Sequence, residues 1–336
     1  MGKRSDMRHR GTNRRTFVAA SVGMLGIAAG RGAAHGQTPI STPAEGWTSS
    51  TALPAPRSEF AATVLAGRIY IAGGFGAESD FSRFAPESGE WTELAPMPAP
   101  RHHLGLAALG DAVYVAGGHT ADTNTATDTF WRYDPHLDRW EDGPALPQGP
   151  RGALGCAALG DKLYAVGGSS GDLGGPATAD VACFDPGRGT WSMVAPLPTA
   201  REHLAVAATS TRLLAIGGRN GGADIGPELG GATELYDPAT DLWERGTPLP
   251  VPRSGMGVAS DGDVVIVLGG EGPEGIYDQV NRYDPAADEW SSLPDLPQGR
   301  HGVGAAIVDR TLYAIGGSTL AWSVQNIFGV DSLHLR

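Results

Sequence analysis

The sequence is poor in cysteine, in charge and in long apolar runs. It contains two cysteines in 336 residues, which excludes the small scaffolds that depend on several disulfides. Charged residues make up 18% of the chain, against about 25% in an average globular protein. The most continuous apolar stretch, residues 17–29, is shorter than the roughly 20 residues that a membrane-spanning helix needs. We therefore expect no stable insertion into a membrane.

Positive charge is scarce outside the N-terminal region. The formal net charge is −12, and residues 1–36 carry seven of the 25 lysines and arginines but one of the 37 acidic residues. The remainder of the chain therefore has a formal net charge of −18. Nucleic-acid binding favours basic surfaces, because the phosphate backbone is anionic. We expect no nucleic-acid partner.

The N-terminal region has the features of an export signal. Arg14 and Arg15 follow a basic start and precede the apolar stretch, and the small residues Ala34 and Gly36 offer a cleavage point before Gln37. This pattern resembles a twin-arginine signal, which addresses folded proteins for export across the bacterial inner membrane. We predict a signal peptide over residues 1–36 and a linker over 37–46. The protein is then expected in the periplasm, in the cell envelope or outside the cell.

Glycine and proline, by contrast, are abundant, with 50 and 25 residues. Both destabilise helix interiors, so this composition excludes a helical bundle. The glycines also recur in a pattern, because a Gly-Gly pair occurs six times at intervals of 44–52 residues. The pairs begin at Gly73, Gly117, Gly167, Gly217, Gly269 and Gly316.

Each Gly-Gly pair belongs to a unit with nearly constant internal spacing. An apolar run such as VYVA precedes every pair, and an arginine stands 16 residues before its first glycine. A tryptophan precedes each arginine by ten or eleven residues. The tryptophans are Trp47, Trp91, Trp140, Trp191, Trp243 and Trp290, and the arginines are Arg57, Arg101, Arg151, Arg201, Arg253 and Arg300.

Such a unit predicts four short strands, a to d, joined by turns. Strand b is apolar on both faces, so its sheet must lie between neighbouring sheets, as it does when sheets are arranged radially. The pattern resembles the kelch repeat, and the resemblance implies an all-β, six-bladed propeller over residues 47–336. Trp47 lies in a strand d with no strands a to c before it. We expect this N-terminal strand to join the C-terminal a, b and c strands and close the ring.

The up-and-down order of the strands assigns the loops to faces. The arginines, the Gly-Gly pairs, the b-to-c loops and the d-to-a loops share one face, which we predict to be the binding surface because the b-to-c loops vary in length. Kelch domains of ubiquitin-ligase substrate adaptors bind acidic peptides through equivalent positions. By that resemblance, the candidate ligand-binding residues are the six arginines together with His119, Arg219, Glu271, Asp80, Asp180, Gln279 and Asn326.

The sequence leaves two roles open for the arginines. They could form a basic funnel for an anionic ligand, or they could be frame residues paired with Asp80, Asp180 or backbone carbonyls. The first role predicts an exported binding module for a carbohydrate or peptide that carries an anionic group. The alternative is a sugar-acting enzyme such as the sialic-acid mutarotases, which are six-bladed kelch proteins with acid–base residues in the funnel. A galactose-oxidase-like enzyme is disfavoured, because neither Cys156 nor Cys183 falls on the predicted binding surface.

Histidines suggest a metal site without defining one. Five of them fall on the face of the arginines, and three glutamates and Asp80 lie nearby in the same scheme. Because they come from different blades, no metal-ligand spacing is diagnostic. The sequence therefore predicts neither a metal centre nor another cofactor. The residues concerned are His102, His103, His119, His203 and His301, with Glu59, Glu202 and Glu271.

Overall fold

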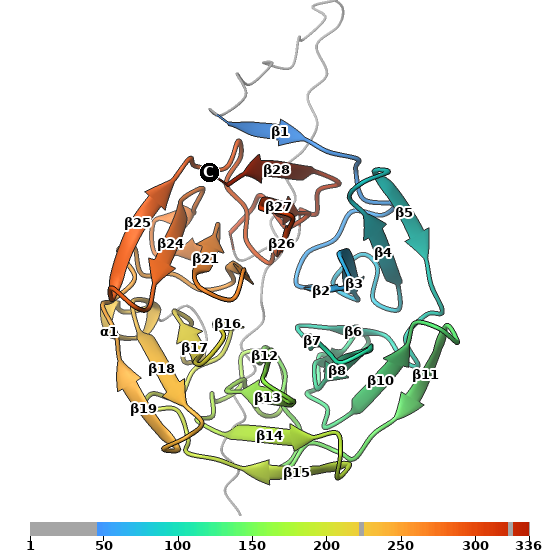
Figure 1. Ribbon diagram of the computed structural model, residues 1–336, viewed down its shortest axis with the longest axis vertical. Helices are drawn as coiled ribbons and strands as arrows, with labels where there is room; N and C mark the ends of the chain where they lie inside the picture. The colour runs from blue at the N-terminus through green and yellow to red at the C-terminus, as the bar shows by residue number, and fades with distance from the viewer. Residues whose placement is uncertain (1–45, 222–224, 322–324, 336) are drawn as a thin grey trace, which may run out of the picture. The chain divides into compact units, whose positions relative to one another are not determined.

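The computed structural model describes residues 46–221, 225–321 and 325–335. The predicted signal peptide lies outside the described residues, as does the predicted linker apart from residue 46. Within the described part, six four-stranded antiparallel sheets stand radially around a central axis (Figure 1). The predicted all-β, six-bladed propeller is thus confirmed.

Each blade consists of consecutive strands ordered from the axis outwards. The first three blades contain β2 (Ala61–Leu65), β3 (Arg68–Ala72), β4 (Phe81–Ala85) and β5 (Glu90–Glu93); β7 (Gly105–Leu109), β8 (Ala112–Ala116), β10 (Phe130–Asp134) and β11 (Arg139–Asp142); and β12 (Gly155–Leu159), β13 (Lys162–Val166), β14 (Val181–Asp185) and β15 (Thr190–Met193). The next two contain β16 (Ala205–Ala208), β17 (Leu213–Ile216), β18 (Thr233–Asp237) and β19 (Leu242–Arg245); and β20 (Gly257–Ser260), β21 (Val265–Leu268), β24 (Val280–Asp284) and β25 (Glu289–Leu293).

The sixth blade is assembled from both ends of the described chain. Its inner strands are β26 (Gly304–Val308), β27 (Thr311–Ile315) and β28 (Val330–His334), and its outer strand is β1 (Trp47–Ser49). Strand β1 pairs antiparallel with β28, with Trp47 opposite Leu333. The predicted closure is confirmed, and it covers an edge of β28 that would otherwise be free to pair with another chain.

Apolar side chains fill the spaces between blades. Phe130 of the second blade packs edge-on against Phe184 of the third, with ring centroids 4.7 Å apart. The tryptophans also link neighbouring blades by hydrogen bonds. Trp140 Nε1, for example, donates to the Ala95 carbonyl of the preceding blade at 2.9 Å. Equivalent indole bonds come from Trp47, Trp91, Trp191, Trp243 and Trp290. The constant spacing of the tryptophans therefore reflects one contact repeated between all the blades.

The Gly-Gly pairs allow neighbouring backbones to approach closely. Gly117 has a φ of +59°, and a Cβ there would lie 2.3 Å from the Arg151 carbonyl oxygen of the next blade. Gly118 N donates to that same oxygen at 2.9 Å. All six pairs bind the next arginine's carbonyl in this way, so the backbone requires glycine here.

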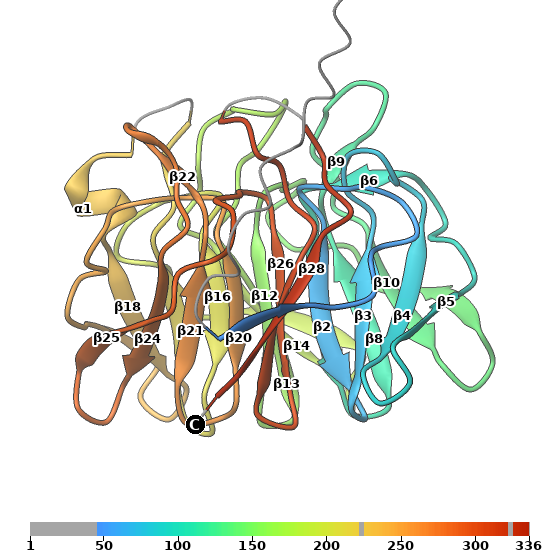
Figure 2. The same ribbon diagram turned by 90° about the horizontal axis from the view of Figure 1, so that it is seen from above.

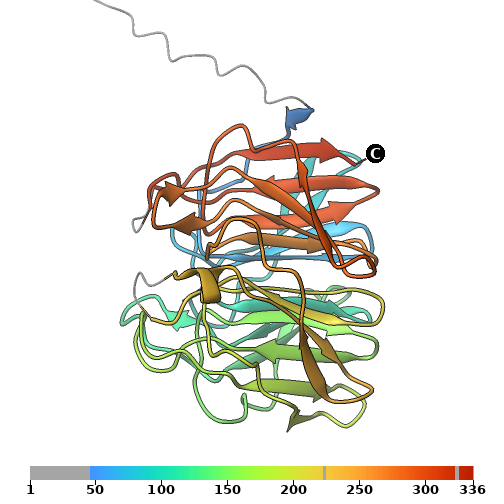
Figure 3. The same cartoon turned by 90° about the vertical axis from the view of Figure 1, so that its left-hand side faces the viewer.

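One face of the propeller carries the loops predicted for binding, and we call it the mouth face. Its short elements are β6 (Arg101–His102), β9 (His119–Thr120), α1 (Pro227–Gly230), β22 (Glu271–Gly272) and β23 (Gly275–Ile276). Figure 2 shows β6, β9, β22 and α1 together on this face, and Figure 3 shows α1 and the C-terminus on opposite sides. Among the described helices, none has the length and apolarity that a bilayer crossing requires.

Candidate functional site

A ring of six residues surrounds the axis at the mouth face. Each of them lies two positions after one of the six arginines of the repeat. Every member has a positive φ, from 51° to 62°, and every backbone N–H donates to the carbonyl of the member in the preceding blade at 2.8–3.0 Å. These bonds close a complete circle. The ring members are Glu59, His103, Ala153, His203, Gly255 and Gly302.

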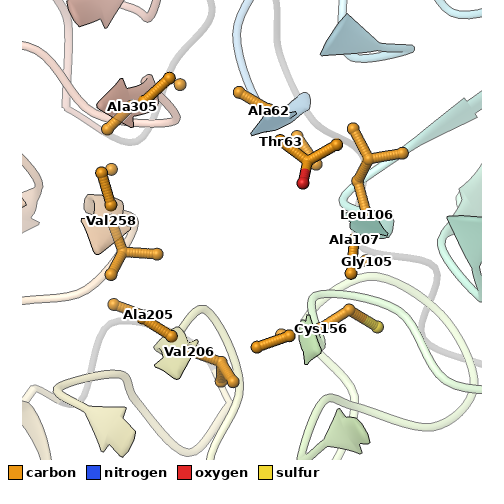
Figure 4. Close-up of a pocket in the computed structure, with 18 of the residues that line it drawn as sticks. Ala62, Thr63, Gly105, Leu106, Ala107, Cys156, Ala205, Val206, Val258 and Ala305 are labelled. Atoms are coloured by element: carbon orange, nitrogen blue, oxygen red, sulfur yellow. The ribbon is translucent and has the colours of Figure 1, made fainter. Parts of the chain in front are cut away.

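Below this ring lies a central channel of about 330 Å³. Strands β2, β7, β12, β16, β20 and β26 form its wall, and small apolar side chains such as Ala62, Ala205 and Val258 face it, with Cys156 beside them (Figure 4). A smaller cavity of about 100 Å³ is lined by the ring itself, including Glu59, His103 and His203. The charged side chains of the axis therefore gather at the ring, while the side chains of the wall beneath are mostly small and apolar.

The six arginines of the repeat lie inside the blades. Their residues are at most 8% exposed, and the guanidinium groups of five of them donate to backbone carbonyls of their own blade. Arg201 pairs with Glu234, which is also buried, through Nη2 and Oε2 at 2.5 Å, and Arg300 pairs with Asp331. The Arg101 guanidinium donates to the neighbouring Pro100 carbonyl at 2.7 Å and lies 5.2 Å from the centroid of the Trp131 ring. This placement favours the frame role that the sequence left open.

The ring side chains join a larger group, which we call the mouth cluster. In order around the axis, it comprises His103, Glu59, His301, Glu271, Arg219 and His203, with Glu202 beside the last two. Glu59 lies between two imidazoles, 3.3 Å from His103 Nε2 and 3.5 Å from His301 Nε2. Arg219 lies between two carboxylates, 2.7 Å from Glu202 and 2.7 Å from Glu271.

Further contacts complete the mouth cluster. His301 Nε2 lies 3.8 Å from Glu271, Arg219 Nη2 lies 3.1 Å from His203 Nε2, and His203 Nδ1 bonds to Glu202. The His203 and His103 rings meet edge-on with centroids 4.7 Å apart. Five blades thus contribute to one connected circuit of acidic, basic and imidazole groups.

Charge pairing controls ionisation in the mouth cluster. Burial alone would raise the pKa of Glu202, but His203 and Arg219 outweigh it and lower that pKa to about 2. Burial opposes the charge on Arg219, yet Glu202 and Glu271 raise its pKa above the usual value. Glu202 and Arg219 are therefore both ionised at neutral pH.

A second histidine group adjoins the mouth cluster, and we call it the histidine triad: His102, His103 and His119. One potential ligand atom from each lies within 4.8 Å of the others, and the same is true of Glu59, His103 and His203. Burial, reinforced by neighbouring histidines, lowers the pKa of His103 well below its usual range and that of His119 to about 4. The sequence-based expectation of no metal centre stays a prediction.

The other predicted site residues are distributed between the frame and the loops. His119, Arg219 and Glu271 lie in the two groups just described. Asp80 is exposed and pairs with Arg57 at 3.3 Å, while the backbone carbonyls of Asp180 and Gln279 accept from Arg151 and Arg253. Asn326 Nδ2 donates to the Phe75 carbonyl at 2.7 Å. The last four therefore contribute mainly to blade and loop structure.

Several residues of the mouth cluster were named from the sequence only in connection with an undefined metal site, and they were absent from the candidate ligand-binding residues. They are the residues one or two positions after the repeat arginines: Glu59, His103, Glu202, His203 and His301. A comparison of the repeats could have identified them, because both positions hold ionisable residues in some units and Ser, Gly or Ala in others. Their side chains point toward the axis because the ring residues have a left-handed backbone, and the sequence does not show this conformation.

Comparisons with known families match more than half of the chain. A profile described as the KLHDC2/KLHL20/DRC7 kelch-repeats domain matches residues 41–218. The kelch motif matches residues 252–297 as well. The two matches together extend from the first blade into the fifth.

Individual proteins are similar to shorter parts of the chain. Beta-scruin of Limulus polyphemus is 38% identical over 80 residues, which are 24% of this chain and 8% of that protein. Kelch-like ECH-associated protein 1B of Danio rerio is 33% identical over 87 residues, 26% of this chain and 15% of that protein. The match thus spans less than a fifth of either relative.

A solved structure titled "Structure of YjhT" is similar in fold. It has a TM-score of 0.71 at 17% identity, and the match covers 83% of this chain and 95% of that one. This is a likeness of fold alone.

Proposed function

Because the chain belongs to the kelch-repeat family of β-propellers, we propose that it is an exported binding module whose mouth face holds a carbohydrate or peptide ligand. The mouth cluster carries this proposal. Its carboxylates, imidazoles and guanidinium converge at the end of the axis, beside the loops that differ most between blades. A concave site with a few convergent polar groups is the usual form of a ligand site.

The charges of the mouth cluster favour a ligand rich in hydroxyl groups. The six repeat arginines are buried in the blades and bonded to them, so they lend no support to a basic funnel. The mouth cluster instead has three carboxylates, from Glu59, Glu202 and Glu271, against the one guanidinium of Arg219. Carboxylates accept hydrogen bonds from hydroxyl groups, and a guanidinium donates them. A carbohydrate satisfies both kinds of group.

A sugar-acting enzyme of the mutarotase type is the second candidate, and Glu59 is the residue that favours it. Its carboxylate is 12% exposed and lies within 3.5 Å of two imidazoles. Mutarotation requires a proton to be removed from one sugar oxygen and another to be delivered, which a carboxylate and an imidazole in contact can perform. Glu59 would act as the base and His103 or His301 as its proton-exchanging partner.

A ligand screen with one matched pair of variants tests the proposal. The untagged mature protein is heated with neutral sugars, uronic acids, sialic acids and peptides. A ligand at 100 times its Kd should stabilise the folded state by about 2.7 kcal/mol. We expect a carbohydrate to raise the melting temperature of wild type and of Glu87→Gln, whose carboxylate is 57% exposed in the β4–β5 turn of the opposite face. Glu59→Gln should lose most of that rise.

The same samples separate the two candidate functions. Exchange between the α and β anomers of the stabilising sugar is followed by NMR. Faster exchange with wild type and with Glu87→Gln, but not with Glu59→Gln, would support the enzyme. Stabilisation without faster exchange would support the binding module. An equal shift for wild type and Glu59→Gln, or no shift from any compound, would contradict the proposed site.

A further inference from the structure

We propose that the histidine triad binds one divalent transition-metal ion, for which Zn²⁺ is the best match. His102, His103 and His119 each offer one donor atom, and these atoms lie within 4.8 Å of one another. Metal–nitrogen bonds of about 2.0–2.1 Å in a tetrahedral site place two donors on one ion about 3.3–3.4 Å apart, so side-chain rotations are enough to bring the three donor atoms onto one ion. Imidazoles without a thiolate suit Zn²⁺ and related ions. The triad shares His103 with the mouth cluster, but binding of the ion does not require the proposed carbohydrate ligand.

The ring nitrogens of His102 and His103 meet inside the triad, where their two Nδ1 atoms lie 2.5 Å apart. His102 Nε2 lies 2.9 Å from Asn124 Oδ1, and His103 Nε2 lies 3.3 Å from Glu59 Oε2. An oxygen beside Nε2 favours the tautomer that leaves Nδ1 free to bind a metal, and it orients the ring as outer-shell partners do. The two Nδ1 atoms must move apart by about 1 Å to bind one tetrahedral ion.

His119 supplies an independent reason to expect a ligand. Its residue is fully buried, and neither ring nitrogen has a hydrogen-bond partner among the described residues. Buried polar groups normally have partners, and an exception calls for an explanation such as an ion. Both of its ring nitrogens therefore remain available to a metal.

Two neighbours make room for the triad and orient it. A Cβ on Gly152 would lie 2.0 Å from His119 Cε1 and 2.1 Å from its Nδ1, so the ring occupies space that any other residue at position 152 would fill. Phe75 stacks on His102 with centroids 4.2 Å apart. The other three-residue group, Glu59, His103 and His203, is a weaker candidate, because both ring nitrogens of His203 already contact Glu202 and Arg219.

Metal titration of the untagged protein tests the site. After treatment with EDTA and its removal, wild type is titrated with Zn²⁺ by calorimetry and with Co²⁺ by visible absorption. We expect one equivalent to bind. Loss of an outer-shell partner costs about 10–100-fold in affinity, so His119→Ala, which removes a ligand, should weaken binding at least 100-fold. His136→Ala is the control, since His136 is an exposed imidazole in the turn after β10, outside the triad and the mouth cluster.

The outcomes are distinct. One equivalent in wild type and His136→Ala, with loss in His119→Ala, supports the proposal. Failure of wild type to bind one equivalent overturns it, as does equal binding by His119→Ala. Loss in His203→Ala with retention in His119→Ala would assign the ion to the other group and also overturn it. Circular dichroism in EDTA checks folding, and His119→Gln replaces His119→Ala if the alanine variant unfolds.

Discussion

At the scale of single residues, burial determines what each charged group can do. The repeat arginines and the mouth cluster lie at the same end of the blades, yet the guanidinium groups of five arginines donate to backbone carbonyls within them. Glu59 and Arg219 keep part of their surface accessible at the axis. The arginines therefore stabilise the frame on which the mouth cluster is displayed. We therefore expect substitutions of the repeat arginines to lower stability, and substitutions of the accessible mouth-cluster residues to lower ligand affinity.

Removal of one repeat arginine should destabilise the fold. Arg201 and Glu234 form a fully buried pair, and removing one partner of such a pair leaves an uncompensated charge at a cost of about 3–5 kcal/mol. Arg201→Ala should lower the free energy of unfolding by that amount, as measured by urea denaturation. Arg188→Ala, at a side chain 82% exposed, should change it by less than about 0.5 kcal/mol. Equal stability of the two variants would refute the frame role.

Glu202 should make the fold sensitive to acid. Its pKa is about 2, against an ordinary value of 4.5, so below pH 4.5 the unfolded chain takes up this proton before the folded chain does. The stability that Glu202 contributes is fully present above pH 4.5 and is lost as the pH falls toward 2, by about 3 kcal/mol in all. Denaturation of wild type and Glu202→Gln across this range should show a smaller loss in the variant. Parallel curves would contradict the ionised state of Glu202.

At the scale of elements, contacts between blades repeat more faithfully than contacts at the mouth face. The spacing from arginine to Gly-Gly is invariant because Gly117 and its equivalents accommodate the next blade's carbonyl. This constant spacing is visible in the sequence, so the strands, the ring closure and the assignment of loops to faces could be predicted. The mouth cluster could be predicted only in part. His103 and Glu59 face the axis because of a left-handed backbone, and nothing in their own residue types signals that conformation.

Substitutions of two glycines in the second blade distinguish the cost of backbone strain from the cost of close packing. Gly110 and Gly117 have φ values of +63° and +59°, but an added Cβ at Gly110 meets nothing within 4 Å. Gly110→Ala should cost about 1–2 kcal/mol, the penalty of a left-handed residue. Gly117→Ala should cost clearly more, because its Cβ also overlaps the Arg151 carbonyl of the next blade. Chemical denaturation of both variants provides the measurement, and equal costs would contradict the close-approach explanation.

At the scale of the whole molecule, stability depends on a closed circle. The ring of backbone bonds at the mouth face and the tryptophan bonds between blades continue around all six blades, and the pairing of β1 with β28 completes the sixth blade. Closure by an N-terminal strand could be read from the sequence because Trp47 begins the repeat pattern without the strands that should precede it. What the mouth binds could not be read, because ligand recognition depends on side chains that meet only after closure.

Opening the circle should expose the edge of β28. Removal of residues 1–49 deletes β1 together with the buried Trp47, and loss of a buried tryptophan alone costs about 3–5 kcal/mol. We expect a lower melting temperature and association through the free edge, detected by light scattering. Removal of residues 1–40 retains β1 and serves as the control. A stable monomer without β1 would show that closure is dispensable.

We propose that the mouth cluster forms the binding site of the propeller, and a crystal structure of the protein with the carbohydrate that raises its melting temperature most would test this. We expect the sugar at the mouth face, with hydroxyl groups within hydrogen-bond distance of Glu59 and Arg219. A sugar bound only on the opposite face, or only between the outer strands of two blades, would show that the mouth cluster is not the binding site.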